Sequence, residues 1–432
     1  MPDQISQISL PRPKRRRIDP WSVGALVIAA MVMMPILAVV WFALTPTENI
    51  WPHLISTTLP RYLSNTFVLM LSVGMITAVV GTGTAWLVVM YRFPGRAVLQ
   101  WALLMPLAVP AYVGAYALVD FLEYAGPVQT GLRDAFGWTS PRDYWFPAIR
   151  TREAAIVVLS AALYPYVYLL ARAAFREQSG AAFEVARALG AGAWGRFLRV
   201  GLPLARPAIA AAVAIVMMET VNDYGTVDYF AVQTLTTGIF SVWLQAGNLG
   251  GAAQLASTML AVIVILVLAE KLSRRKIRFF GSARGARPVA PEPLAGWQAW
   301  TATALCLFPV LMGFVLPLSV ITSHALNADM WLAPGLRRAV LHTVTVGGIA
   351  AVLTVVGGVF MVYGVRMSRH RLPALLMPVT AIGYAAPGAV LGLGILVPLA
   401  AFDNRLADGI VAAGFSDPGL IFTGSAAALV LA

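Results

Sequence analysis

The sequence predicts an all-α polytopic membrane protein built from two tandem six-helix modules, the second truncated at about its fourth helix. Three observations predict this class: the composition, a series of long apolar runs, and an internal repeat. Hydrophobic residues make up 59% of the 432 residues and charged residues only 12%, and the mean hydropathy is +0.77. This balance is far from that of a soluble domain.

The first predicted module spans residues 21–270 and follows a basic tail, residues 1–20. Its runs are near or above the roughly 18 to 20 residues that cross a bilayer as a helix. A fifth, weaker span begins at Pro207 and is interrupted by Glu219 and Asp223. The other five predicted spans are residues 21–44, 65–91, 97–119, 154–171 and 252–269.

A basic, proline-rich linker, residues 271–296, separates this module from a second, residues 297–432, in which the pattern begins again. Aligning Asn65 with His342 gives an offset of 342 minus 65, or 277 residues, and the same offset pairs Pro110 with Pro387. Such self-similarity predicts an internal duplication, and six spans would return the second copy to the same side of the membrane. The apolar runs of this module are residues 297–323, 339–365, 372–401 and one that opens at 419.

The orientation follows from the distribution of Lys and Arg. Basic residues flank the cytoplasmic ends of membrane spans, so the basic tail predicts a cytoplasmic N-terminus. Alternating sides from there places 23 of the 31 basic residues inside and 8 outside. The net charge of +12 is therefore explained by membrane topology, and no nucleic-acid partner is expected. The single cysteine, Cys306, lies in an apolar run and predicts a packed core residue.

A polar stretch between the fourth and fifth spans is predicted to form two short amphipathic helices on the cytoplasmic side. Apolar residues recur there at steps of three or four, and charged residues take the remaining surface. Gly190 can adopt the positive φ that ends the first helix, and Pro203 is expected to end the second. An ordinary solvated loop would explain the spacing equally well.

This stretch resembles the EAA loop of ABC-transporter membrane subunits. Glu184 and Ala186 are followed by Gly190, and Leu202 and Pro203 close the pattern. We call residues 183–207 the EAA-like loop. In that family the loop docks into a cleft on a separate ATPase subunit, so the resemblance gives these five residues a coupling role.

The resemblance also implies the partners and the location. The expected partners are a dimer of ABC ATPase subunits, a periplasmic substrate-binding protein and the lipid bilayer of the bacterial inner membrane. No Walker-type phosphate-binding sequence occurs in the chain, so ATP is expected to be hydrolysed by the partner, and no cofactor is expected here. A second EAA-like loop would lie beyond Ala432, so we expect the chain to be a fragment of a protein with about twelve spans.

Two further stretches, residues 218–230 and 106–112, resemble the fused two-copy permeases of ferric-iron ABC importers. Glu219, Asp223, Tyr224 and Asp228 lie in the first of them. Charge inside a membrane is costly, so such residues are functional candidates for the substrate path, and their oxygen atoms suit a hard cation. Glu219 and Asp223 are four residues apart and would share one face if that segment is helical. They equally suit a structural pairing or a wet outer surface.

Several alternatives remain open at this point. Thiamine and polyamine permeases are built from related halves. An ion-coupled secondary transporter would use Glu219 or Asp223 as a relay and would need no ATPase. An embedded enzyme lacks support, because no nucleophile and base pair and no metal cluster stand out.

Overall fold

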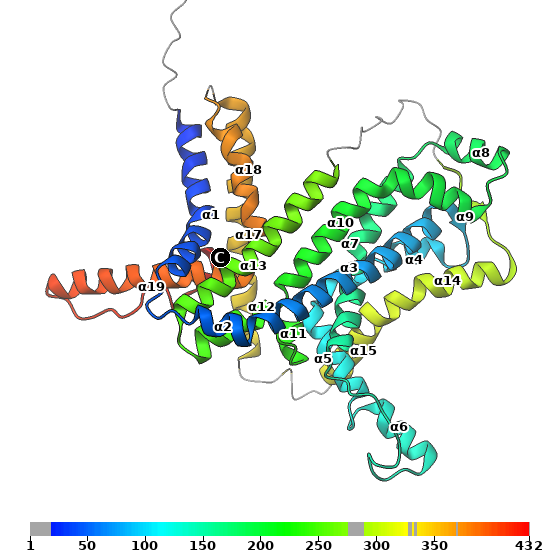
Figure 1. Cartoon of the computed structure of the whole chain (residues 1–432), viewed down its shortest axis with the longest axis horizontal. Coiled ribbons are helices and arrows are strands. Elements are labelled where there is room, and N and C mark those ends of the chain that lie inside the picture. The colour runs from blue at the N-terminus through cyan, green and yellow to red at the C-terminus, as the bar shows by residue number, and fades with distance from the viewer. Residues whose placement is uncertain (1–18, 275–288, 327–330, 332–334, 369, 432) are drawn as a thin grey trace, which may run out of the picture. The chain divides into compact units, whose positions relative to one another are not determined.

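The computed structural model describes residues 19–274, 289–326, 331, 335–368 and 370–431, and these are almost entirely α-helical (Figure 1). Most of the predicted basic tail (1–20) and of the linker (271–296) lies outside these residues. The elements are α1 (Pro20–Leu44), α2 (Trp51–Thr57), α3 (Leu59–Met90), β1 (Tyr91–Arg92), α4 (Arg96–Ala102), α5 (Ala111–Leu122), α6 (Pro127–Phe136), α7 (Arg152–Arg176), α8 (Gly180–Ala188), α9 (Ala193–Arg196), α10 (Leu202–Asn222), α11 (Gly225–Tyr229), α12 (Leu235–Phe240), α13 (Leu249–Arg274), β2 (Glu292–Pro293), α14 (Gly296–Val310), α15 (Leu316–Ala325), α17 (Leu336–Met367), α18 (Leu372–Ala385), α19 (Gly388–Ala412) and α20 (Ala426–Leu431).

The prediction of an all-α polytopic membrane protein is confirmed. Among the described residues, eight helices are long and apolar enough to cross a membrane, or nine if one bent pair counts as a span. Six of the nine, including the bent pair, lie before residue 275. The apolar side chains that such helices leave exposed are the ones a bilayer would cover.

The span predicted at residues 97–119 is sharply bent. The chain there forms two helical segments, 96–108 and 111–136, that meet at 95°. Pro110 explains the bend, because a proline disfavours helical geometry in the residue before it, and Val109 is extended, with φ −110° and ψ 116°.

The apolar run at residues 372–401 is divided at Pro387 for the same reason. Ala386, which precedes Pro387, is extended, with φ −73° and ψ 129°, so α18 ends there and α19 begins at Gly388. The run that opens at residue 419 forms only the short helix α20 among the described residues.

The helix bounds agree with the offset of 277 residues. Helices α3 and α17 both contain 32 residues, and both their first residues (59 and 336) and their last (90 and 367) differ by 277. Pro110 directly precedes α5, and Pro387 directly precedes α19. This agreement supports the predicted repeat, while two complete six-helix modules remain a prediction.

The contacts divide the chain into two units. Unit 1 contains residues up to Ala38, Arg337–Ala386 and Leu391–Ala432, and unit 2 contains Val39–Leu336 and Pro387–Val390. In unit 1 the rings of Trp21 on α1 and Phe360 on α17 lie 4.9 Å apart. Unit 2 includes α14 and α15, which the sequence predicts at the start of the second module.

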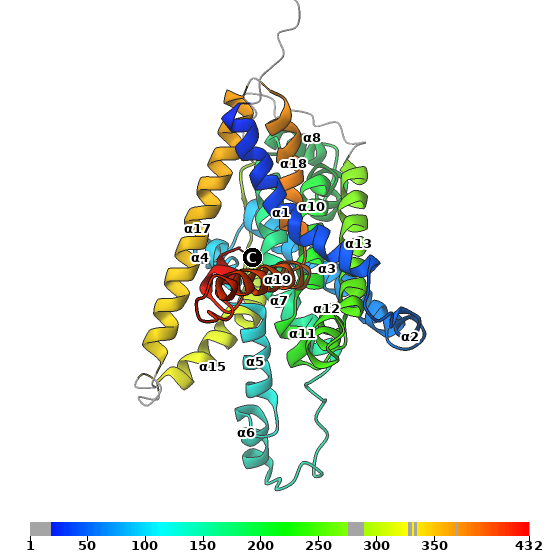
Figure 2. The same cartoon turned by 90° about the vertical axis from the view of Figure 1, so that its left-hand side faces the viewer.

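Unit 2 is built on α3, α7 and α10, which run side by side (Figure 1). Helices α8 and α9 lie at one end of this bundle, and α5, α6 and α11 lie towards the other (Figure 2). Helices α3 and α7 approach closely at Gly81, where an added Cβ would lie 2.7 Å from Cβ of Val167. The bundle therefore holds its two ends apart by the length of α7, 25 residues or about 37 Å.

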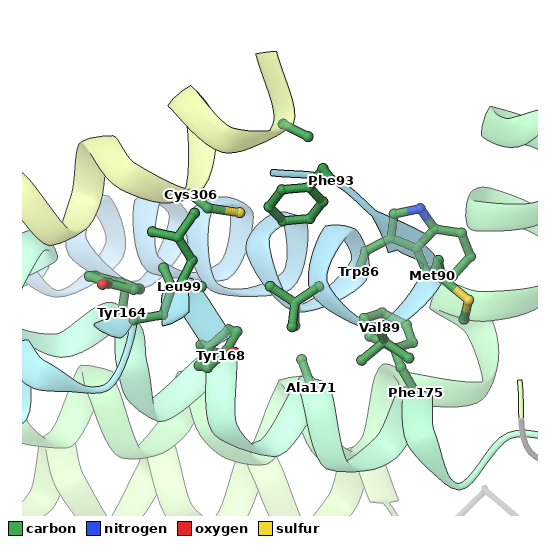
Figure 3. Close-up of a cluster of buried hydrophobic side chains, with 14 of the residues drawn as sticks. Trp86, Val89, Met90, Phe93, Leu99, Tyr164, Tyr168, Ala171, Phe175 and Cys306 are labelled. Carbon is green, nitrogen blue, oxygen red and sulfur yellow. The ribbon is translucent and has the colours of Figure 1, made fainter. Parts of the chain in front are cut away.

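The core of unit 2 joins side chains from α3, α4, α7 and α14 (Figure 3). Tyr164, Tyr168 and Phe175 of α7 are almost fully buried in it. Cys306 of α14 is also buried, which confirms the predicted packing role. Because burying large apolar side chains is the main driving force of folding, this core fixes the frame on which both ends are built.

Candidate functional site

The EAA-like loop forms a helix-turn-helix at the end of unit 2 where α7 finishes. The first helix is α8, the turn contains Gly190 with φ +83°, and the second helix begins with α9. The left-handed conformation of Gly190 places no Cβ against the backbone, so glycine is the favoured residue there. The predicted break at Gly190 is confirmed.

The prediction that Pro203 ends the second helix is wrong. Helix α9 continues through a π-helical turn, Phe197–Gly201, into α10, and Pro203 is in its first turn. The N–H of Leu202 donates to the carbonyl of Phe197 five residues earlier. A π turn widens the helix, which relieves the clash between the proline ring and the preceding turn. The loop is thus continuous with a membrane span.

Aromatic packing fixes the loop to the bundle. Trp86 of α3 lies 5.3 Å from Phe175, 5.9 Å from Phe183 and 5.0 Å from Phe197, measured between ring centres. Gly201 lets this ring approach, because an added Cβ would lie 2.4 Å from Cζ3 of Trp86. The side-chain amide of Gln178 also donates to the Gly201 carbonyl at 3.0 Å. Trp86 therefore ties both helices of the loop to α3 and α7.

The outer surface of the loop is exposed and partly apolar. Glu184 is exposed and Ala186 is half-buried, whereas Leu189 and Trp194 are 82% and 74% exposed. Apolar side chains clustered among polar ones are typical of a surface that binds another protein. The part of the loop that packs on Trp86, which we call its base, is therefore fixed. The exposed part that contains Glu184, Leu189 and Trp194, which we call its tip, is open to a partner.

A feature that was not predicted from the sequence is the part of the linker that contains β2 (Glu292–Pro293), which we call the strap. Strand β2 pairs in parallel with β1, and the Leu294 N–H donates to the Arg92 carbonyl at 2.9 Å. On this strap Glu292 accepts hydrogen bonds from both Arg196, with Nη2 to Oε2 at 3.0 Å, and Arg187, with Nη1 to Oε1 at 3.2 Å. Glu292 is the single acidic residue of the predicted linker, which is the signal that was available.

The electrostatics of Glu292 follow from this contact. The hydrogen bond from the Arg196 guanidinium holds the pKa of the Glu292 carboxyl below its ordinary value. Arg196 is the more buried partner, with 15% of its side chain exposed, against 70% for Arg187. The strap thus fixes the second helix of the loop more firmly than the first.

The first two substrate-path candidates do not lie on one helical segment. Helix α10 ends at Asn222, and Asp223 is extended, so Glu219 and Asp223 do not share a helical face. Asp223 instead accepts the N–H groups of Thr226 and Val227 at 3.0 and 3.1 Å and thereby caps α11. This role is structural.

The remaining two candidates, Tyr224 and Asp228, lie near the surface. The Tyr224 ring packs 4.4 Å from Phe240, and Asp228 is exposed. Within the described residues no group of three or more His, Cys, Asp or Glu side chains is placed to hold a metal ion. The candidates therefore form no tight cation cage in the part of the chain that the structure covers.

A second feature missed from the sequence is an open cavity of about 410 Å³ at the other end of α7. We call it the arginine pocket, since Arg61, Arg150 and Arg152 line it. Arg61 lies in the first turn of α3 and Arg152 is the first residue of α7. Arg61 is far from the other two arginines in the sequence, so only the fold brings it to them.

His324 is another residue whose partners the sequence did not indicate. Its Nε2 lies 3.2 Å from Oδ2 of Asp120 and 3.4 Å from the Tyr116 hydroxyl. These contacts join α15 to α5. The arrangement is a local hydrogen-bonded cluster that ties α15 to unit 2.

Comparison with known proteins identifies related transport subunits. Residues 70–279 match the family model described as "Binding-protein-dependent transport system inner membrane component". The Fe(3+)-transport system permease protein FbpB 2 of Haemophilus influenzae is 25% identical over 343 residues, which are 77% of this chain and 62% of that protein. The chain therefore spans less than two thirds of that relative.

Two shorter relatives come from Escherichia coli K12. The molybdenum transport system permease protein ModB is 27% identical over 44% of this chain and 82% of its own length. The sulfate transport system permease protein CysT is 27% identical over 45% of this chain and 68% of its own length. The relatives thus share a transport role and differ in what their names say they carry.

Proposed function

We propose that the chain is the transmembrane subunit of an ATP-driven importer, because residues 70–279 match the family of binding-protein-dependent transport system inner membrane components. A separate ABC ATPase dimer would hydrolyse ATP, and a periplasmic binding protein would deliver the cargo. The chain itself would perform no covalent chemistry. The bacterial inner membrane is its expected location, with the N-terminus in the cytoplasm.

The observation that carries this proposal is the form of the EAA-like loop. Its tip exposes Leu189, Trp194 and Glu184, while its base is packed on Trp86. A surface that is to transmit force needs both properties, because a docked tip moves the bundle only if its base is rigid. The ATPase is proposed to grip this tip.

The mechanism that follows is alternating access. ATP binding would close the paired ATPases and move the docked loop as a rigid body. Because the second helix of the loop is continuous with α10 through the π turn, the displacement would pass directly into a membrane span. A ligand shifts such an equilibrium only if it binds one state better than the other, so ATP must favour the closed ATPase dimer.

Ferric iron is the cargo that we propose, on the similarity to a Fe(3+)-transport permease and on the resemblance of residues 218–230. The absence of a tight cage among the described residues suits a path that releases its cargo. An oxyanion is the second candidate, favoured by the three arginines of the arginine pocket and by the molybdenum and sulfate relatives.

Uptake in reconstituted liposomes tests the proposal. The full-length system is assembled with its ATPase and binding protein, and the uptake of iron, sulfate, thiamine and polyamine is compared. We expect uptake that requires ATP, the ATPase and the binding protein. Uptake that persists without the ATPase and the binding protein would instead identify an ion-coupled secondary transporter.

A further inference from the structure

We propose that the arginine pocket is a binding site for a small oxyanion with at least two negative charges. The pocket lies at the end of unit 2 opposite the EAA-like loop, so the proposed function places it on the periplasmic side, and the inference rests on that orientation. The ligand class follows from the charge, the partners and the backbone of the residues that line the cavity.

The pocket gathers positive charge in a part of the chain where basic residues are few. The predicted topology places only 8 of the 31 basic residues outside, and three of these, Arg61, Arg150 and Arg152, line this one cavity. The carboxylates beside them are Glu153, which also lines the cavity, and Glu123, which pairs with Arg150 at 3.3 Å. The cluster keeps an excess of positive charge that attracts an anion.

Two of the guanidinium groups have long hydrogen bonds or none within the described chain. Arg61 forms no ion pair or hydrogen bond recorded among the described residues and is exposed. Arg152 reaches Oδ1 of Asn65 and Oε1 of Glu153 only at 3.4 Å each. An oxyanion in the cavity would supply acceptors for the guanidinium groups that have long hydrogen bonds or none.

Two of the arginines also lie at the N-terminal ends of helices. Arg61 and Arg152 lie in the first turns of α3 and α7, where the positive end of the helix dipole disfavours a cation. Neither arginine is therefore placed to stabilise its own helix. An anion bound between them would be attracted by both side chains and by both helix ends.

The backbone that lines the pocket is strained at one residue. Ala231 lines the pocket and has φ +56°, the single positive value found for a non-glycine residue in the described chain. This conformation costs an L-residue energy, and such strain persists where the surroundings hold it for a function. The loop that contains Ala231 is fixed to α3, because the Asn65 amide donates to the Gln233 carbonyl at 2.8 Å.

Isothermal titration of the full-length protein in lipid nanodiscs tests this site. Sodium sulfate is the probe, and sodium chloride keeps the ionic strength constant because screening weakens surface charge interactions. We expect saturable binding that weakens about tenfold in Arg61→Gln and in Arg152→Gln, since each loses a charge-assisted hydrogen bond. Arg142→Gln is the matched control, because Arg142 is exposed in the same predicted outer segment but does not line the cavity.

A second arm identifies the source of the anion. Citrate and ferric citrate are titrated in the same way. Binding of sulfate or citrate alone shows that a free oxyanion occupies the pocket, whereas binding of ferric citrate alone shows that the anion arrives with the metal. Either result supports the site if Arg61→Gln weakens it.

Three results would overturn the inference. They are no saturable binding of any probe, equal binding in all variants, or a loss of affinity for the periplasmic binding protein in Arg61→Gln without any anion binding. The last would make the pocket a protein-docking surface. Because the ATPase is absent from these titrations, their failure would leave the proposed coupling through the EAA-like loop untouched.

Discussion

The two ends of α7 both gather arginines, but these arginines differ in the hydrogen bonds that they form within the chain. At the end that meets the EAA-like loop, Arg187 and Arg196 share the carboxylate of Glu292. At the other end, Arg61 has no recorded partner in the described chain and Arg152 has only long contacts. An arginine that is hydrogen-bonded to a carboxylate within the chain fixes a shape, whereas an arginine without such a bond is available to a ligand from outside.

The largest effect is expected from Glu184→Ala at the exposed tip of the loop. Because Glu184 is exposed, its removal should leave folding intact and weaken docking of the ATPase. A lost interface hot spot costs roughly 2 kcal/mol or more, which corresponds to about thirtyfold or more in affinity. Transport-coupled ATP hydrolysis and ATPase affinity are measured in liposomes.

Glu177→Ala is the matched control, since Glu177 is also exposed and follows α7 directly but lies outside the EAA-like loop. Equal coupling in both variants would remove Glu184 from the docking surface and would leave the tip without a defined contact.

The next effect concerns the rigid base of the loop. Gly201→Ala would place a Cβ 2.4 Å from the Trp86 ring, and overpacking of this kind costs about 1–3 kcal/mol. Gly195→Ala on α9 is the control, because its nearest contact would be an ordinary 3.5 Å to Ala191. Thermal unfolding in detergent compares the two, and equal stability would show that the base is not tightly packed.

A smaller effect is expected from Glu292→Gln, which keeps the shape of the side chain and removes its charge. The partners are partly exposed, so the pair contributes little to global stability, and coupling should fall by about threefold. Hydrogen exchange of α9 should rise at the same time. If a charge swap, Glu292→Arg with Arg196→Glu, fails to restore slow exchange, the pair does not position the loop.

The smallest effect is the response of the strap to pH. The pKa of Glu292 is lowered by the hydrogen bond from Arg196, so its contribution is fully present above the ordinary pKa of glutamate and is lost as the pH falls through the lowered value. Between pH 6 and 8, hydrogen exchange of α9, corrected for the intrinsic rate, should therefore be constant. A change within that window would mean that another group controls the loop.

Much of the fold could be predicted, because membrane spans are set by long apolar runs and by the basic residues beside them. The repeat was visible as one offset, and the bounds of α3 and α17 agree with it. The bend at Pro110 was not predicted, because an apolar run does not show where its direction changes. The role of Pro203 was misjudged because a π turn accommodates it.

The candidate site was predicted only where its signal is local in the sequence. The turn at Gly190 follows from a short motif, and the structure confirms it. The partners of Glu292 lie 96 and 105 residues away, and Arg61 meets Arg152 only through the packing of α3 on α7. The spacing of Glu219 and Asp223 suits one face of a helix, but α10 ends at Asn222, one residue before Asp223.

The proposed coupling requires the tip of the EAA-like loop to contact an ATPase in the cytoplasm. Leu189→Cys tests it directly, because Leu189 is 82% exposed and the native Cys306 is buried. In membranes that contain the co-expressed ATPase, we expect a thiol crosslinker to join Leu189→Cys to that subunit, and a membrane-impermeant maleimide added outside to leave it unlabelled. Labelling from the outside, or no crosslink to the ATPase, would contradict the account.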